Sequence, residues 1–78
     1  MKILVINPNT TLEMTQSIGE MAEKYCIPGT QITAISPDWG PRSIEGHFEE
    51  YSSAMATVET VAKFREEYDA FIIACYEY

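Results

Sequence analysis

Two stretches of the chain are almost continuously apolar and rich in β-branched residues. Residues 2–6 (KILVI) are followed by an Asn-Pro pair, and residues 70–75 (AFIIAC) lie near the end of the 78-residue sequence. Apolar runs of this length predict strands that are buried on both faces, as in a parallel sheet. A third stretch, residues 30–36 (TQITAIS), is half polar, which predicts a strand at the edge of the same sheet.

The segment between the first two strands predicts a helix from about Thr11 to Tyr25. Thr10 and Glu13 form a capping box at its start, and Pro28-Gly29 ends it. Its apolar residues recur at steps of three and four, which predicts one apolar helix face. That face comprises Met14, Ile18, Met21, Ala22 and Tyr25.

A second helix is predicted from about Glu49 to Glu67. The loop before it, PDWGPRSIEGH, contains two prolines and two glycines. With 78 residues and no repeat or low-complexity segment, a single α/β domain over residues 1–78 is expected. The helical spacing again predicts one face, which comprises Tyr51, Met55, Val58, Val61, Ala62 and Arg65.

Alternating strands and helices predict a parallel sheet with right-handed crossovers. The first and third strands are apolar throughout and favour neighbours on both sides, whereas the half-polar second strand suits an edge. The predicted strand order is therefore 2-1-3, which is the flavodoxin-like arrangement of three layers with one helix on each face.

The charge balance excludes some partners. The chain has 12 acidic and 5 basic residues, a net charge of −7, and no basic run. Nucleic acid and anionic membranes are therefore not expected as partners, because phosphate binding needs clustered Lys and Arg.

The start, MKILVINPNT, has the pattern of neither a signal peptide nor a membrane span. Cys26 and Cys75 lack any CxxC or Cys/His spacing, so free thiols and a cytoplasmic location are expected.

Polar residues and one cysteine follow the two apolar strands. Asn7, Pro8, Asn9 and Thr10 come directly after the first strand, and Cys75 ends the third. In the order 2-1-3 these strands are neighbours, so their carboxyl ends meet at one rim. Open α/β sheets bind ligands at such a rim, where the strand order reverses.

These residue types can serve a ligand site. A cysteine at a strand end near helix N-termini can have its pKa lowered toward ambient pH. The asparagine side chains, together with the free N–H groups at the first helix's start, can donate hydrogen bonds to a ligand oxygen.

Four separated motifs carry a family resemblance: MKILVINPNT, PGT, PRSIEGH and YDAFIIAC. Together they resemble the start of the hydantoin racemases, within the aspartate/glutamate racemase superfamily. The resemblance implies two related α/β lobes, no cofactor and no metal, and one cysteine from each lobe at a shared site. One thiolate removes the proton from the stereocentre of a small-molecule substrate, and the other thiol returns a proton to the opposite face.

By this resemblance Cys75 is the catalytic cysteine of the first lobe. The segment Asn7–Thr10 would hold the substrate's polar groups, and Tyr76 matches an aromatic residue common at that place. Glu77 and Tyr78 depart from the family pattern, and the second cysteine has no counterpart in these 78 residues. The chain is therefore interpreted as the front part of a racemase lobe that is inactive alone. Hydantoin, allantoin, aspartate and glutamate all remain possible substrates.

Each of these residues also has an ordinary structural interpretation. Cys75 can be an inert buried thiol, Asn7 and Asn9 turn residues, and Thr10 a helix cap. Cys26, at the tail of the first helix, is expected to pack rather than react. His47 followed by two nearby glutamates lacks the ligand geometry of a metal site.

Two other classes of protein remain open. The first is a flavodoxin-like module that binds flavin or phosphate, although NPNTT contains no glycine-rich phosphate loop. The second is a non-catalytic protein that completes its sheet with another chain. Independently of these classes, the open edge of the third strand, which contains no proline, predicts a homo-oligomer through that strand, or else a chain that is poorly soluble and partly unfolded.

Overall fold

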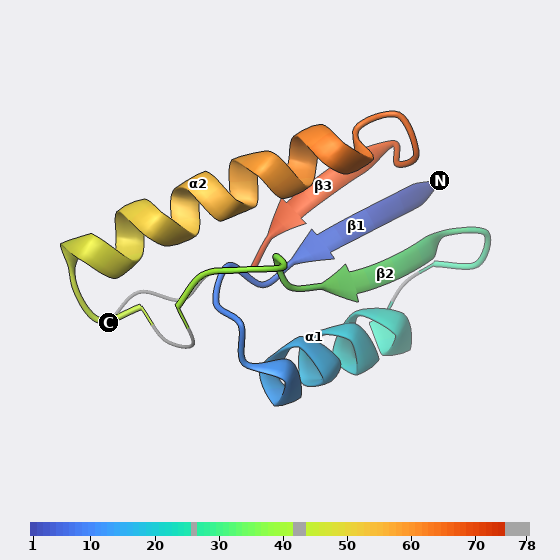
Figure 1. Cartoon of the computed structure of the whole chain (residues 1–78). Coiled ribbons are helices and arrows are strands. Elements are labelled where there is room, and N and C mark those ends of the chain that lie inside the picture. Colours follow the sequence, from blue (N-terminus) through green and yellow to red (C-terminus); the bar gives the residue numbers. More distant parts are fainter. Residues whose placement is uncertain (26, 42–43, 75–78) are drawn as a thin grey trace.

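The computed structural model describes residues 1–25, 27–41 and 44–74, which alternate between strands and helices (Figure 1). The elements are β1 (Lys2–Ile6), α1 (Leu12–Tyr25), β2 (Gln31–Ile35), α2 (His47–Phe64) and β3 (Ala70–Ile73). This order confirms the predicted alternation. α2 begins two residues before the predicted Glu49, because Gly46 is extended and its carbonyl already accepts the first helical bond from the amide of Glu50.

The three strands form one parallel sheet in the order β2-β1-β3, as predicted. Ile6 pairs with Ile35 of β2 and with Ile73 of β3, so the carboxyl ends of all three strands lie at one edge. α1 covers one face of the sheet and α2 covers the other (Figure 1). This arrangement makes β1 the central strand of a three-layer molecule.

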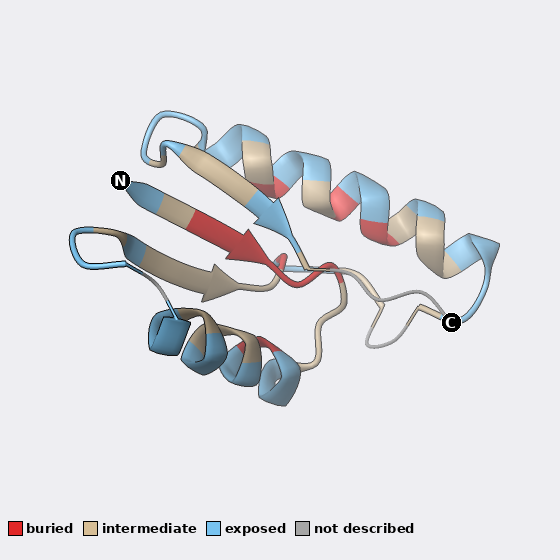
Figure 2. Ribbon diagram, turned by 180° about the vertical axis from the view of Figure 1, so that it is seen from behind, coloured by how far each residue is buried: buried red, intermediate tan, exposed pale blue. Residues whose placement is uncertain are grey.

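The core is small and centres on β1. Its buried apolar residues are Leu4, Val5 and Ile6, with Ala56 from α2 (Figure 2). β1 is buried because it has a strand on each side and a helix over each face. Buried polar residues continue the core toward the carboxyl edge: Asn7, Thr15, Ser53 and Thr60.

The predicted apolar face of α1 does not pack against the sheet as a whole. Met14, Met21 and Tyr25 are exposed, and the only buried residue of α1 is Thr15. Gly19 explains this orientation, because a Cβ built on it would lie 3.1 Å from the Cβ of Ala34 in β2. The helix therefore approaches β2 closely through its small residues and turns its long apolar side chains outward.

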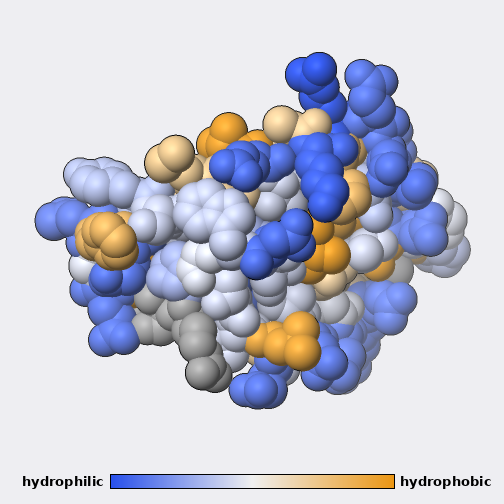
Figure 3. Space-filling view, viewed as in Figure 1, coloured by the Kyte–Doolittle hydropathy of each residue, from blue (hydrophilic) through white to orange (hydrophobic). Residues whose placement is uncertain are grey.

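α2 departs from the prediction in the same way. Its buried residues are the small ones, Ser53, Ala56 and Thr60. Tyr51, Met55 and Val58, which were predicted to share a face, do so, but they are 69%, 63% and 68% exposed. Apolar side chains accordingly lie along the upper margin of the molecule in Figure 3, where α2 runs in Figure 1.

β3 is less buried than its sequence predicts. Ile72 and Ile73 are 50% and 46% exposed, because the sheet as described has no strand beyond β3. β3 is therefore a strand that suits two neighbours but has only β1 beside it in the described sheet, as the sequence predicts for this chain. Among the described residues, neither helix is long and apolar enough to cross a membrane.

Candidate active site

The loops that follow β1 and β3 leave the sheet next to each other. The amide of Ala74 donates to the carbonyl of Ile6 at 2.9 Å, and the amide of Asn7 donates to the carbonyl of Ile35 at 2.9 Å. Residue 74 therefore lies beside the start of the Asn7–Thr10 segment. The predicted catalytic Cys75 follows directly, but Cys75 and Tyr76 lie outside the described residues.

Asn7 is held inside the protein rather than presented at its surface. Its side chain is 2% exposed, and its Nδ2 donates to Asn9 Oδ1 at 3.0 Å and to Thr15 Oγ1 at 3.1 Å. Both hydrogens of the amide are thus used within the loop and the first turn of α1. In this geometry Asn7 orients the segment that follows it.

Thr15 connects the ends of two strands through one hydroxyl group. It accepts from Asn7, donates to the carbonyl of Thr11 at 3.2 Å, and is hydrogen-bonded to the hydroxyl of Ser36 beyond β2. In the bond between Thr15 and Ser36 either hydroxyl can be the donor. Sequence patterns did not identify Thr15 or Ser36. The one available signal was that Thr15 is a polar residue on the side of α1 that is buried.

Asn9 forms a turn just before α1. Its Oδ1 accepts from the amide of Thr11 at 3.1 Å as well as from Asn7. The N–H groups of the first helical turn, from Leu12 onward, have no acceptor within the helix, so they are directed at the rim. They offer hydrogen-bond donors, and a positive helix end, to an anion at this position.

Thr10 connects the Asn7–Thr10 segment to the loop before α2 through two hydrogen bonds. Its amide donates to the carbonyl of Pro41 at 2.9 Å, and its hydroxyl donates to the carbonyl of Gly40 at 3.4 Å. Gly40 has φ +129°, a conformation that favours glycine, and it lies between Thr10 and Ala56 of α2. The loop from β2 is thereby brought to the same rim.

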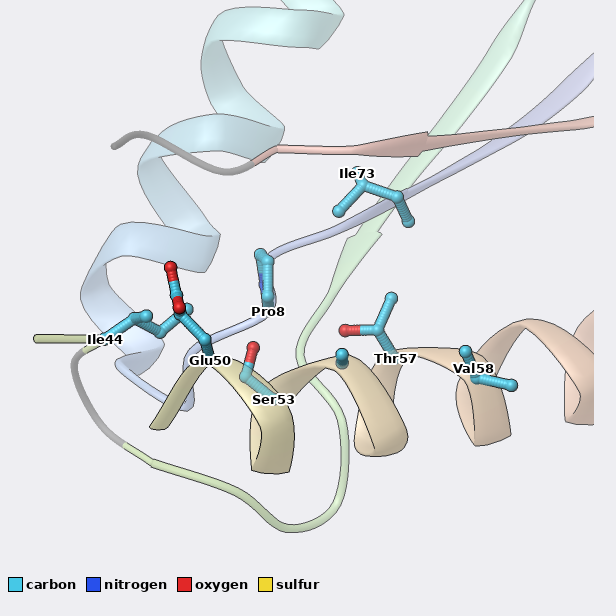
Figure 4. A pocket seen from close by; sticks show the side chains of 8 residues that line it. Pro8, Ile44, Glu50, Ser53, Thr57, Val58 and Ile73 are labelled. Atoms are coloured by element: carbon cyan, nitrogen blue, oxygen red, sulfur yellow. The ribbon is translucent and has the colours of Figure 1, made fainter. Parts of the chain in front are cut away.

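A cavity of about 370 Å³ opens between this rim and α2 (Figure 4). Pro8 and Ile73 bound it from the sheet, whereas Ser53 and Thr57 project from α2. The Oγ1 of Thr57 is buried and has no hydrogen-bond partner among the described residues. Among the described residues, the cavity is lined by Pro8, Ile44, Glu50, Ser53, Ala54, Thr57, Val58 and Ile73.

Two other residues of possible interest, His47 and Trp39, are not among the residues that line this cavity. His47 Nδ1 lies 3.0 Å from Glu50 Oε2, and the ring stacks on Tyr51 at the exposed start of α2. Trp39 Nε1 donates to Glu59 Oε1 at 3.3 Å, farther along α2. Within the described ranges, no three His, Cys, Asp or Glu side chains are grouped closely enough to hold a metal ion.

The fold and the position of the site together define a class of protein. The chain is an α/β protein with strand order 2-1-3, and its candidate ligand site lies at the carboxyl ends of the neighbouring parallel strands β1 and β3. The family model for Asp/Glu/Hydantoin racemase matches residues 3–78. The chain therefore belongs to the Asp/Glu/hydantoin racemase family, and it corresponds to the N-terminal part of the first lobe.

Relatives and solved structures agree with this assignment. A hydantoin racemase of Pseudomonas sp. (strain NS671) is 51% identical over 77 residues, which are 97% of this chain and 31% of that protein. A hydantoin racemase of Paenarthrobacter aurescens is 41% identical, over 97% of this chain and 33% of its own. The structure of an allantoin racemase from Klebsiella pneumoniae matches with a TM-score of 0.91 and 46% identity, over 96% of this chain and 31% of that one. The chain thus spans about a third of the length of the relatives it matches.

Proposed function

We propose that this chain carries the first-lobe half of a racemase site, in which Cys75 exchanges a proton with the substrate's stereocentre. The observation that carries the proposal is the pairing of β1 with β3. Ala74 hydrogen-bonds to Ile6, so the residue before Cys75 lies beside the residue before Asn7. Membership of a racemase family supports the assignment of the chemistry.

In the proposed reaction the Cys75 thiolate takes the hydrogen from a carbon next to a carbonyl group. The electron pair moves to the carbonyl oxygen and forms an enolate, which the first-turn N–H groups of α1 and the side-chain amide of Asn9 can stabilise. A thiol on the opposite face, supplied by a second lobe, then protonates the same carbon. The proton balance closes without a cofactor, because one thiol becomes a thiolate as the other thiolate becomes a thiol.

The substrate we propose is an uncharged ring of the hydantoin type rather than aspartate or glutamate. The relatives named above are hydantoin and allantoin racemases. In addition, the described residues that line the cavity beside Pro8 include the carboxylate of Glu50 and neither lysine nor arginine. A substrate with a second carboxylate would be repelled there. Because the chemistry requires reduced thiols, we place the protein in the cytoplasm.

A chimera tests the assignment of Cys75. Residues 1–78 would replace the matching third of the Pseudomonas hydantoin racemase, and racemisation of a 5-substituted hydantoin would be followed by optical rotation. We expect an active chimera that loses at least about 100-fold in rate on Cys75→Ser, because an acid–base group of this kind contributes that much or more. Cys26→Ser is the matched control and should leave the rate unchanged. Equal rates for both variants would contradict the proposal.

We also propose that the isolated chain self-associates through β3. Ile72 and Ile73 are about half exposed, and the outer edge of β3 carries no partner strand in the described sheet. Such an edge can pair with the same edge of another copy. Sedimentation analysis should show a dimer or larger species that Ile73→Lys dissociates. A monomer at high concentration, with the amides of residues 70–74 protected from exchange, would refute self-association.

A further inference from the structure

Three polar side chains of α2 line the cavity at steps of one helical turn. Glu50, Ser53 and Thr57 are three and four residues apart, so they lie on one face of the helix. In Figure 4 all three project from α2 toward Pro8 and Ile73, which bound the cavity from the sheet. Ser53 is 3% exposed, so this row of polar groups belongs to the wall of the cavity rather than to the outer surface of the helix.

The hydroxyl of Thr57 lacks a partner. Its Oγ1 is buried and forms no hydrogen bond among the described residues. Most buried polar groups in folded proteins have a hydrogen-bond partner, and a buried group without one costs free energy. The Thr57 hydroxyl therefore indicates that the cavity receives a polar group of a ligand.

Glu50 contributes a carboxylate that is oriented from outside the cavity. Its Oε2 lies 3.0 Å from Nδ1 of His47, which is not among the described residues that line the cavity. A carboxylate has about four acceptor sites on its two oxygens, so Glu50 can also accept a hydrogen bond from a donor inside the cavity. The wall thus presents an acceptor at Glu50, followed by two hydroxyls that can donate or accept.

This row of groups is complementary to one edge of a hydantoin ring. In the reaction proposed above, the carbonyl group next to the reacting carbon faces the N–H groups at the start of α1. The remaining edge of the ring is a urea unit, which consists of an N–H group, a carbonyl group and a second N–H group. A carboxylate accepts from an N–H group, whereas a hydroxyl can donate to the carbonyl or accept from the second N–H group. Pro8 and Ile73 offer apolar contacts to the ring.

We propose that Glu50, Ser53 and Thr57 form the subsite that binds the urea edge of the substrate ring. This inference rests on the proposed function, because it takes a hydantoin as the substrate and assigns the part of the ring that does not react. It also has a consequence for specificity. A ring-opened N-carbamoyl amino acid carries a free carboxylate, which Glu50 would repel, so the subsite favours the closed ring.

Calorimetric titration with 5-benzylhydantoin tests the subsite in the chimera with the Pseudomonas enzyme. The chimera carries Cys75→Ser throughout, so that binding is measured without turnover. Glu50→Ala and Thr57→Val should each raise the Kd by about 10-fold, because each removes a hydrogen bond between the ligand and the cavity wall. Glu49→Ala is the matched control, since it removes the same charge from the same helical turn but lies outside the described lining. It should leave the Kd unchanged, and equal effects of Glu50→Ala and Glu49→Ala would overturn the proposal.

Methylation of the ligand identifies the group that Glu50 binds. A 5-benzylhydantoin that is methylated on the nitrogen facing Glu50 should bind about 10-fold more weakly to the parent chimera, and it should show no such penalty in Glu50→Ala. The two losses overlap in this way only if the carboxylate and the N–H group contact each other. If methylation of either ring nitrogen weakens binding equally in the parent and in Glu50→Ala, the proposal is wrong.

The 78-residue chain provides a measurement that does not depend on the chimera. Titration with 5-benzylhydantoin should shift the amide NMR signals of Ser53 and Thr57, and Glu50→Ala should remove these shifts. Unchanged signals in the parent chain, or a chimera in which all three variants bind like the parent because polypeptide fills the cavity, would contradict the subsite. None of these readings depends on Cys75, so a failure of its proton-transfer role and a failure of the subsite are distinguishable.

Discussion

The hydroxyl of Thr15 makes three hydrogen bonds near the rim. It joins the Asn7 side chain at the end of β1 to Ser36 at the end of β2, within the first turn of α1. Asn7 in turn orients Asn9, which accepts from the amide of Thr11 just before α1. The position of the Asn7–Thr10 segment therefore depends on a buried residue of α1.

Two threonine-to-valine substitutions compare a hydroxyl that has hydrogen-bond partners, that of Thr15, with one that has none among the described residues, that of Thr57. Thr15→Val should lower the free energy of unfolding by about 1–3 kcal/mol, because Asn7 and Ser36 would each lose a buried partner. Thr57→Val should be neutral or stabilising, within about 1 kcal/mol, because the buried Oγ1 of Thr57 has no partner to lose among the described residues. Both changes keep a β-branched side chain in a helix.

Urea unfolding of the two variants and the parent chain measures this difference at a single fixed protein concentration. A fixed concentration is needed because self-association would otherwise shift the midpoint. Similar losses for both variants would show that the Thr15 hydroxyl has no special role.

At the scale of elements, both helices pack through small residues. α1 approaches β2 at Gly19, and α2 turns Ser53, Ala56 and Thr60 inward. Small side chains allow a helix to lie close to the sheet. The longer apolar side chains then lie on the sides of the helix that do not contact the sheet. This explains why each helix exposes several large apolar residues.

Gly19→Val tests the close approach of α1. The added Cβ would lie 3.1 Å from the Cβ of Ala34 before its methyl groups are counted, so α1 must shift. We expect a loss of about 1–3 kcal/mol from overpacking. Ser17→Val, at an exposed position of the same helix, controls for the helix propensity of valine. Equal losses of thermal stability in Gly19→Val and Ser17→Val would contradict the close packing described for Gly19.

The sequence predicted the sheet better than the helix faces. Strand order followed from polarity, because KILVI suits a centre and TQITAIS an edge. Periodicity groups Tyr51, Met55 and Val58 correctly on one face, but it does not show which neighbour covers that face. The small residues that pack inward give no hydrophobic signal.

The candidate site was predicted only in outline. The Asn7–Thr10 segment lies at the carboxyl edge next to Ala74, as expected from the strand order. The bond from Asn7 to Thr15 and the bond from Thr10 to Pro41 were not predicted. Such contacts depend on how the loops fold over the sheet, which a pattern of residue types does not determine. Cys75 and Tyr76 remain predictions, since they lie outside the described residues.

At the scale of the whole molecule, the described residues form a folded sheet with exposed apolar side chains. In that sheet no strand lies beyond β3, and Tyr51, Met55 and Val58 of α2 are exposed, while the matched region is only 31% of the Pseudomonas enzyme. The proposed chemistry also needs a second acid–base group from outside this segment. Stability and activity are therefore both expected to increase when the rest of a racemase is present.

The isolated chain should accordingly show no racemisation of hydantoins, allantoin, aspartate or glutamate above the rate in buffer. Incubation of each enantiomer with the purified chain, followed by chiral chromatography, measures this directly. Activity that persists in the isolated chain and disappears on Cys75→Ser would show that a second copy supplies the missing group.

The most direct measurement is hydrogen exchange at the stereocentre in D2O, in the chimera with the Pseudomonas enzyme. With both thiols present, each enantiomer of a 5-substituted hydantoin should take up deuterium as it racemises. In Cys75→Ser racemisation should stop, and deuterium uptake should persist for only one enantiomer, the one whose hydrogen faces the second thiol. Uptake that stays equal for both enantiomers in Cys75→Ser, with racemisation intact, would contradict a proton-transfer role for Cys75.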